Sequence, residues 1–397
     1  MKPLKLMAGA AMLALIASCA HNVSKETTRS GLDPENFKTV VGNDSTALYV
    51  LTNSNGMEVC ITNFGGRVVS VMVPDKNGDF KDVVLGFDSI SDYLPEHNLS
   101  DFGASIGRYA NRIRNGEFAL GSDTIRLPRN NFGHSLHGGG EMGDLGWQYR
   151  IYKAVQPNDS TLELTLDSPD GDNNYPGHVQ AKVTYRLTSD NAIDIACEAV
   201  TDRPTVINMT HHGYFNLGGD FSRPVTDDII QINASAFTPV DSTYIPTGEI
   251  LPVAGTPMDF TKAKKVGEEI ADFDFVQLKN GNGYDHNYVL DTKGDISKPA
   301  AIVYSPASGI RMEMFTTEPG VQFYSGNFLD GTLSGKGGVK LNQRTGLCLE
   351  PQHYPDSPNH PEWPSTVLNP GETYNSRIIY KFSVGPELTP VAGKTAK

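Results

Sequence analysis

The chain has 397 residues, which is long enough to bury a sizeable hydrophobic core. Its formal net charge of −13 argues against nucleic acid or an anionic bilayer surface as a partner, because either would require a basic patch. A neutral ligand is compatible with this charge. The 40 glycines and 25 prolines are spread along the chain and indicate many short strands joined by tight turns.

The N-terminus has the pattern of a targeting segment. Lys2 and Lys5 precede an apolar stretch at 6–17, which has the length of a signal-peptide core and is too short to span a bilayer. The residues at 16–18 then lead into Cys19 as in a bacterial lipobox. We therefore predict a lipoprotein signal peptide at 1–18, lipidation of Cys19 and a polar tether at 19–34. An ordinary secretory signal with an incidental cysteine is the alternative.

This assignment predicts the place of the protein in the cell. A lipidated chain would lie in the bacterial cell envelope, facing the periplasm or associated with the outer membrane. It would contact the membrane only through its lipid anchor, because the net charge of −13 argues against an anionic bilayer surface as a partner. The stretch before Pro34 has too little apolar content to join a core.

Short apolar or alternating runs dominate the rest of the chain and are bounded by Gly, Pro, Asn or Asp, as β-strands are. They predict strands at 47–51, 58–62, 67–73, 162–166, 179–187, 192–200, 229–232, 300–304, 310–315 and 378–383. The segment PDKNGDF at 74–80 predicts a hairpin turn because it contains Asn-Gly. Helical periodicity is scarce. The best candidate is 260–271, where Val266 and Ile270 lie four residues apart, and 89–93 predicts a further turn or two.

The chain shows no internal repeat and no long linker between 35 and 385. We therefore predict one large, mainly antiparallel, all-β sandwich domain at 35–385, followed by a C-terminal tail at 386–397. The remaining cysteines, Cys60, Cys197 and Cys348, stand among apolar neighbours. They are typical of buried core thiols, with room for one disulfide, and their spacing does not match a metal site.

The run VINMTHHGYFNL at 206–217 contains two adjacent histidines. Neighbouring side chains of a strand point to opposite faces, so His211 and His212 cannot both line one pocket. The same divergence argues against a metal site built on the pair. His212 shares its face with Thr210 and Tyr214.

The run GLCLEPQHYPD at 346–356 places Glu350 in a segment otherwise suited to burial. A carboxylate in such a strand is either functional or part of a structural ion pair, and both readings remain open at this point. Histidine and glutamate have ordinary pKa values of about 6.5 and 4.3, which burial and neighbouring charges can shift toward neutrality. A His and a Glu from distant strands could therefore move a proton between two oxygens of one small molecule.

Six segments, in this order, resemble the aldose 1-epimerase (galactose mutarotase) family: GRYANRI at 107–113, SLHGG at 135–139, NMTHHGYFNL at 208–217, GYDHNYVL at 283–290, PGVQFYSGNFLDGTL at 319–333 and CLEPQHYPDSPN at 348–359. The likeness covers roughly residues 35–385. It implies a β-supersandwich of the galactose mutarotase type with a few short helices. It also implies an isomerase that interconverts the α and β anomers of free aldoses such as glucose and galactose.

The resemblance implies roles for particular residues. His212 corresponds to the family's general acid, Glu350 to its general base, and His137 to a histidine that orients the sugar and assists the acid. The expected sugar-binding residues are Asn111, Arg112, Tyr214, Asp285 and Gln322. Arg108 and His134 are weaker rivals, and His286 is expected to face away from the sugar. His211 and Gly213 replace the family's usual Asn and Ser, which affects how His212 is held.

The family reaction needs no cofactor, although the sequence leaves room for a structural divalent cation. We expect a free aldose as the partner, no nucleic acid, and a monomer or weak dimer. Two other classes of protein remain open. A sandwich-fold glycoside hydrolase or lyase would normally need a second carboxylate, for which Asp285 is the candidate. A non-catalytic sugar-binding lipoprotein would use Glu350 and His212 only to hold hydroxyl groups.

Overall fold

The computed structural model describes residues 27–139 and 145–390. The expected signal peptide and Cys19 lie outside the described residues, as does the end of the C-terminal tail. Within the described ranges, no helix is both long and apolar enough to cross a membrane.

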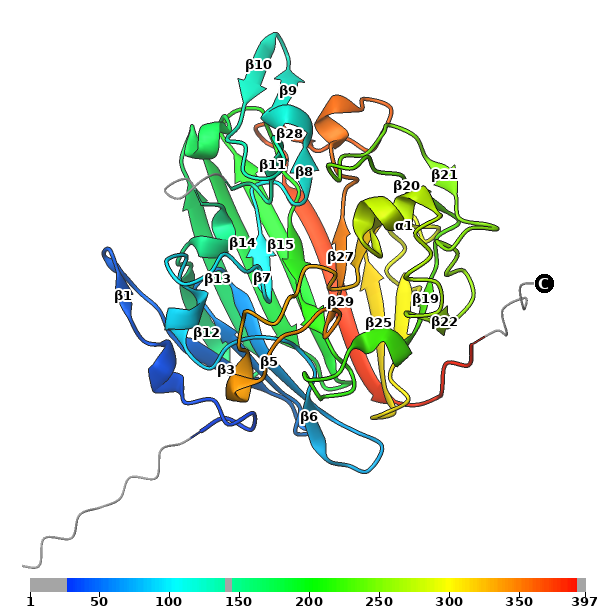
Figure 1. Cartoon of the computed structure of the whole chain (residues 1–397). Coiled ribbons are helices and arrows are strands. Elements are labelled where there is room, and N and C mark those ends of the chain that lie inside the picture. Colours follow the sequence, from blue (N-terminus) through cyan, green and yellow to red (C-terminus); the bar gives the residue numbers. More distant parts are fainter. Residues whose placement is uncertain (1–26, 140–144, 391–397) are drawn as a thin grey trace, which may run out of the picture.

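The largest sheet has nine antiparallel strands in the order β12-β13-β14-β15-β29-β25-β24-β19-β22 (Figure 1). These strands are Lys153–Asn158 (β12), Thr161–Ser168 (β13), Val179–Leu187 (β14), Ala192–Thr201 (β15), Tyr374–Val384 (β29), Ile310–Thr316 (β25), Ala301–Tyr304 (β24), Ile229–Ile232 (β19) and Lys264–Lys265 (β22). Buried and more exposed positions alternate along most of β13, β14 and β25, so this sheet has one core-facing side and one outer side.

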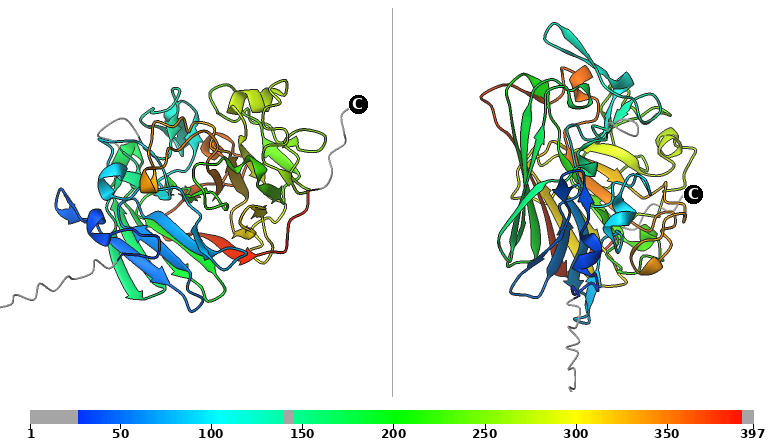
Figure 2. Two further views of the ribbon diagram at one scale, coloured as in Figure 1. Left: turned by 60° about the horizontal axis from the view of Figure 1, so that its bottom comes forward. Right: turned by 90° about the vertical axis from the view of Figure 1, so that its left-hand side faces the viewer.

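A second sheet of six strands, in the order β18-β27-β26-β23-β20-β21, carries much of the site. Its strands are Tyr214–Phe215 (β18), Leu347–Gln352 (β27), Gly320–Tyr324 (β26), Asp285–Val289 (β23), Ala236–Thr238 (β20) and Leu251–Pro252 (β21). Every residue of β26 and β27 is buried, because one side of these strands faces the core and the other lines a pocket. The two sheets form separate layers (Figure 2), and the Tyr380 hydroxyl of β29 donates a hydrogen bond across the core to the Leu349 carbonyl of β27, at 2.7 Å.

The other strands form smaller sheets around these two layers. A four-stranded sheet contains Leu48–Thr52 (β3), Glu58–Thr62 (β4), Arg67–Pro74 (β5) and Phe80–Asp82 (β6). The two-stranded pairs are Val40–Val41 (β1) with Asp44–Ser45 (β2), Ala104–Ile106 (β7) with Thr210–His212 (β17), Arg112–Ile113 (β8) with Ser135–Leu136 (β11), Glu117–Leu120 (β9) with Asp123–Arg126 (β10), and Thr205–Val206 (β16) with Val367–Leu368 (β28). In the described part of the chain, the single α-helix is Val276–Gly281 (α1).

The predicted all-β, mainly antiparallel fold is confirmed. Each of the ten predicted strands is present, with its ends shifted by a few residues at most. The Asn77-Gly78 turn joins β5 to β6, and Ile90–Tyr93 forms a short 3-10 helix. Cys60, Cys197 and Cys348 are buried and free.

The helix predicted at 260–271 is wrong. Val266 donates its N–H to the carbonyl of Asp228, and Gly267 donates to that of Thr226, so these backbone hydrogen bonds lead to a neighbouring segment. Val266 and Ile270 are buried because turns fold them into the core. A four-residue spacing between two buried side chains therefore does not require a helix.

The boundary between tether and domain also differs from the expectation. Leu32 is buried in a cluster with Phe37, and the Ser30 hydroxyl lies 3.0 Å from the hydroxyl of Ser70 on β5. The segment at 28–34 therefore packs on the domain and does not belong to the tether. Burial of Leu32, the Ser30 hydroxyl contact and the Arg29 guanidinium over the Phe80 ring together hold this otherwise polar stretch.

Candidate functional site

One cavity of about 400 Å³ brings together every predicted site residue within the domain. These residues are Asn111, Arg112, His137, His212, Tyr214, Asp285, Gln322 and Glu350. Gln322 and Glu350 are cross-strand partners on β26 and β27, and Asp285 comes from the neighbouring strand β23. Their side chains reach the same pocket because partners in an antiparallel pair point to the same face.

His212 and Glu350 face each other in this pocket. The His212 Nε2 atom lies 3.5 Å from a Glu350 carboxylate oxygen, and both side chains are buried. That carboxylate oxygen and the His212 Nδ1 atom have no hydrogen-bond partner among the described residues. Buried polar atoms without partners are costly, so this pair is suited to binding a polar ligand.

Burial changes the proton affinities of both groups. It raises the pKa of Glu350 well above its usual value, and the carboxylates of Asp285 and Asp101 add to this rise. It lowers the pKa of His212 to about 3, helped by the neighbouring His211. Both shifts act in the same sense, because burial disfavours the charged form of each group.

His137 is held by reciprocal contacts with Asn111. The ring Nδ1 atom of His137 accepts a hydrogen bond from the backbone N–H of Asn111 at 3.1 Å. The backbone N–H of His137 donates to the backbone carbonyl of Asn111 at 2.9 Å. Burial, His212 and Arg112 hold the pKa of His137 well below its ordinary value. An acceptor at Nδ1 places the proton of the neutral ring on Nε2, so His137 can act as a hydrogen-bond donor.

Asp285, Gln322 and Arg112 are ordered by hydrogen bonds to neighbouring side chains. The Gln322 side-chain amide donates to the Asp285 carboxylate at 2.7 Å, and the Gln352 side-chain amide donates to the Gln322 Oε1 atom at 3.3 Å. Burial raises the pKa of Asp285, while Arg112 opposes this rise. Arg112 donates to Asn131 at 3.0 Å, and its guanidinium lies 5.0 Å from the centre of the Tyr244 ring.

The histidines beside the site residues face away from the cavity. The His211 ring lies between Tyr185 and Tyr380, at 6.3 and 5.7 Å from their rings. The His286 Nε2 atom lies 3.2 Å from the Gln277 amide oxygen, behind the pocket. Strand alternation therefore predicted correctly that His211 and His212 face opposite sides, and the structure places His286 away from the cavity, as the resemblance implied.

Neither weaker rival lines the cavity. Arg108 is buried elsewhere, where its guanidinium donates to the Ser168 hydroxyl and to the carbonyls of Pro176 and Gly177. The His134 Nε2 atom lies 2.9 Å from the hydroxyl of Thr243.

Asp101 is the most important pocket residue that the sequence analysis missed. One of its carboxylate oxygens lies within 4.8 Å of ring nitrogens of both His137 and His212. Burial raises the pKa of Asp101 to about 6, against the opposing effects of Arg67 and Gln148. Asp101 stands in a loop before β7, where no motif marked it.

Four aromatic residues, one amide and one leucine complete the lining: Phe132, Tyr244, Tyr324, Phe328, Asn131 and Leu136. Tyr324 could have been predicted, because it stands two positions after Gln322 on β26 and therefore shares its face. Phe132 and Tyr244 come from loops and gave no comparable signal.

Two trios of side chains in the described part could hold a metal ion. They are Asp101, His137 and His212, and His212, Cys348 and Glu350. Burial raises the pKa of the Cys348 thiol well above its ordinary value, which makes it a poor ligand. Both trios include His212, so a metal ion at either place would engage one of the two groups that can transfer a proton.

The fold and the pocket define a β-supersandwich enzyme with an acid–base site for a small polar molecule. Comparison with protein families identifies the family to which this enzyme belongs. The model of the aldose 1-epimerase family matches residues 47–381, and the chain belongs to this family.

Individual relatives agree with this assignment. A galactose mutarotase from Mus musculus is 40% identical over 331 residues, which are 83% of this chain and 92% of the relative. An aldose 1-epimerase from Escherichia coli (strain K12) is 41% identical over 338 residues, 84% and 94% of the two chains.

Solved structures give the same result. An aldose epimerase homologue from C. elegans has a TM-score of 0.78 at 30% identity and covers 85% of this chain and 99% of its own. A galactose 1-epimerase from Lactobacillus acidophilus NCFM has a TM-score of 0.76 at 30% identity, with 88% and 97% covered. The galactose mutarotase type of fold expected from the sequence is confirmed.

Proposed function

We propose that Glu350 and His212 carry out the aldose 1-epimerase reaction of this chain, in which the α and β anomers of a free aldose are interconverted. The observation that carries this proposal is the pair itself: a buried carboxylate and a buried imidazole, 3.5 Å apart, each with an unpartnered atom in one pocket. Galactose is a proposed substrate, in keeping with the name of one relative, and glucose is proposed as a second aldose.

The reaction needs two coupled proton transfers. Glu350 takes the proton from the anomeric hydroxyl O1 while His212 gives a proton to the ring oxygen O5. The C1–O5 bond breaks, C1 and O1 become a carbonyl, and the open sugar rotates about C1–C2. Attack of O5 on the other face of C1 closes the ring, and the two protons return by the same path. Proton transfer alone balances the reaction, so the mechanism requires neither a metal ion nor an organic cofactor.

The sugar must shift the pair from its uncharged state to an ionised one. Hydroxyl groups that donate to Glu350 would lower the pKa of its carboxyl group, and O5 would accept a hydrogen bond from protonated His212. Asp101 supports this state, because an ionised carboxylate within 4.8 Å favours the protonated imidazole. His137 donates a second hydrogen bond near the ring oxygen.

The remaining predicted site residues bind the sugar. Asp285 and Gln322 supply acceptors and donors in a fixed orientation, and Arg112 with Asn111 supplies further donors. Tyr214, stacked on His212 with 5.0 Å between ring centres, provides an apolar surface for the sugar.

Polarimetry tests this function. The protein should accelerate the change in optical rotation of freshly dissolved α-D-galactose and α-D-glucose, at a rate proportional to enzyme concentration. Rates equal to the uncatalysed reaction with both sugars would contradict the proposal and leave a sugar-binding protein. Release of a free sugar from a β-glycoside would instead indicate a hydrolase.

We also propose that the chain is a lipoprotein of the bacterial cell envelope. The support is the sequence before Cys19, with two lysines, a short apolar stretch and small residues. Cys19→Ser in the full-length chain should abolish partitioning into a detergent phase without changing mutarotation. Partitioning of Cys19→Ser with membranes would contradict the anchor. We further propose a monomer or weak dimer.

A further inference from the structure

A row of aromatic rings leads from the proposed catalytic pair toward solvent. It begins at Tyr214, which stacks on His212, and continues to Tyr324 with 6.0 Å between ring centres. Phe328 follows, stacked 6.1 Å from Tyr324. All of these side chains line the same cavity.

The outer end of this row is an aromatic rim, which we define as Phe132, Tyr244 and Phe328. Tyr244 lies 5.7 Å from Phe328 and 5.5 Å from Phe132, measured between ring centres. Phe132 is 62% exposed and Phe328 is 54% exposed, whereas the predicted site residues are buried or half-buried. Large apolar side chains are therefore left open to solvent at the pocket mouth.

Phe132 stands where folding alone does not favour it. It occupies a tight turn whose ends, Asn131 and His134, exchange backbone hydrogen bonds of 3.2 and 2.8 Å. Phe132 has φ of 48° and Gly133 has φ of 83°, a pair of left-handed residues that normally calls for Asn, Asp or Gly. Neither local conformation nor burial explains a phenylalanine here, and such a conformational outlier at a pocket indicates function.

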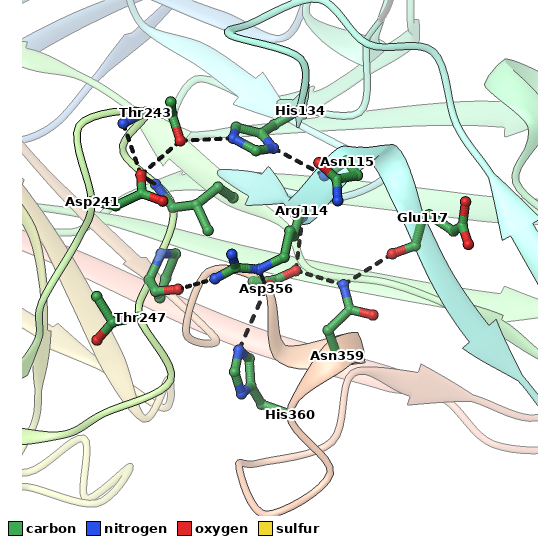
Figure 3. Close-up of polar contacts among 12 residues, drawn as sticks. Arg114, Asn115, Glu117, His134, Asp241, Thr243, Thr247, Asp356, Asn359 and His360 are labelled. Carbon is green, nitrogen blue, oxygen red and sulfur yellow. Dashed lines mark hydrogen bonds and ion pairs between the residues drawn. The ribbon is translucent and has the colours of Figure 1, made fainter.

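The rim is braced from behind by hydrogen bonds (Figure 3). The His134 Nδ1 atom accepts the Asn115 N–H at 2.9 Å, and its Nε2 atom donates to the Thr243 hydroxyl at 2.9 Å. Thr243 in turn donates to Asp241 at 2.6 Å. His134 thus ties the turn that carries Phe132 to the loop that carries Tyr244.

A second set of contacts fixes the same loop to the pocket wall. Arg114 donates to the carbonyl of Pro246, and its backbone N–H donates to the buried carboxylate of Asp356 at 2.8 Å. Arg112 lies over the Tyr244 ring. The rim is therefore preorganised, which lowers the entropy cost of binding a ligand against it.

We propose that the aromatic rim is a second sugar subsite, which binds the neighbouring ring of a reducing disaccharide whose reducing aldose lies in the pocket. This inference rests on the proposed function, because it requires an aldose in the pocket. A pyranose presents a flat face of C–H groups that packs on an aromatic ring, and the three rim side chains carry no charge. The rim is continuous with the pocket, so a ring joined to the bound aldose can reach it.

The test compares monosaccharides with disaccharides by polarimetry. The substrates are freshly dissolved α-D-glucose, α-lactose with its 1→4 linkage, and melibiose with its 1→6 linkage. The proteins are the wild type, the double variant Phe132→Ser/Phe328→Ser, and Phe273→Ser as a matched control. Phe273 is 42% exposed and does not line the cavity.

We expect the double variant to lose about tenfold in kcat/KM for at least one disaccharide, mainly through KM, because two aromatic contacts are lost. Its kcat/KM for glucose should stay within about twofold of the wild type, and Phe273→Ser should match the wild type throughout.

Three results would overturn the inference. An equal loss with glucose would mean that the rim covers the monosaccharide. No change with either disaccharide, or a wild type that uses neither of them, would mean that no second subsite exists. A dimer that dissociates in the double variant, with disaccharide kinetics unchanged, would mean that the rim joins two copies of the chain. Failure of the wild type to accelerate glucose mutarotation would instead contradict the proposed function itself.

Discussion

The pocket has two halves that are built differently. One half comes from strands, and its side chains are placed by the alternation of the backbone: Arg112, His212, Tyr214, Asp285, Gln322 and Glu350. The other half lies between strands, and four of its residues have left-handed backbone: Asn111 (φ 61°), Phe132 (φ 48°), His137 (φ 52°) and Tyr244 (φ 66°). None of the strand-borne residues has such a conformation.

This difference in backbone structure corresponds to a difference in the proposed roles of the two halves. The strand half holds the proposed acid and base, His212 on β17 and Glu350 on β27, which belong to different sheets and are joined by the hydrogen bond from the Thr210 hydroxyl to the Pro351 carbonyl. The loop half adjusts charge and access, and it needs hydrogen bonds such as those between Asn111 and His137 to hold unfavourable backbone conformations. Changes in the strand half should therefore affect chemistry most, and changes in the loop half should tune it.

The largest effect is expected from the two histidines of β17. His212→Asn should lower kcat for mutarotation by about 10²–10⁴, because general acid assistance is lost. His211→Asn should stay within about threefold, because His211 faces the core between Tyr185 and Tyr380. Polarimetry with both variants checks this ranking, and the reverse order would mean that the wrong face of the strand had been assigned to the pocket.

A smaller effect is expected from the loop residue Asp101. Asp101→Asn should lower kcat about tenfold near neutral pH, which corresponds to a shift of about one unit in the pKa of His212. In the wild type, kcat should also fall as the pH drops below about 6, because Asp101 then becomes protonated and no longer favours the imidazolium. The variant should lack the part of this fall that comes from Asp101, whereas the part that comes from protonation of Glu350 should remain.

A matched control separates this role from a structural one. Asp228 is also a buried carboxyl group, with its pKa raised to about 7 by burial, and it does not line the cavity. Asp228→Asn should leave the shape of the pH profile unchanged. A profile of Asp101→Asn that coincides with the wild type would remove Asp101 from the mechanism.

His211, on the side of β17 that faces away from the pocket, should affect how the free energy of unfolding depends on pH. Burial lowers the pKa of His211 to about 4 from about 6.5 in an unfolded chain, so the unfolded state binds the proton more tightly. His211 therefore contributes stability above pH 6.5, and that contribution is lost as the pH falls toward 4. Over this range the wild type should lose up to about 3 kcal/mol more unfolding free energy than His211→Asn. Urea unfolding at several pH values measures this difference, and parallel curves for the two proteins would contradict it.

The same division explains which parts of the site could be predicted from the sequence. Alternation along β17 correctly predicted that His211 and His212 face opposite sides, because a strand leaves only two choices for each side chain. The resemblance to the family, and not alternation, supplied His212, Asp285 and Glu350 as the pocket residues. Asp101 and Tyr244 lie in loops, where direction depends on contacts between segments far apart in the chain. The false helix at 260–271 and the short helix α1, which has only six residues, show the same dependence on tertiary contacts.

The central claim is that Glu350 and His212 act as one unit, and a double-mutant cycle tests it most directly. The rate of anomer exchange would be measured by NMR with the wild type, Glu350→Gln, His212→Asn and the double variant, alongside sugar binding to each protein. Each single variant should lose about 10²–10⁴ in rate while still binding sugar, because ring opening requires both transfers together. The account predicts that the double variant is within about threefold of the slower single variant. Losses that multiply in the double variant would mean that the two groups act independently and would contradict the claim.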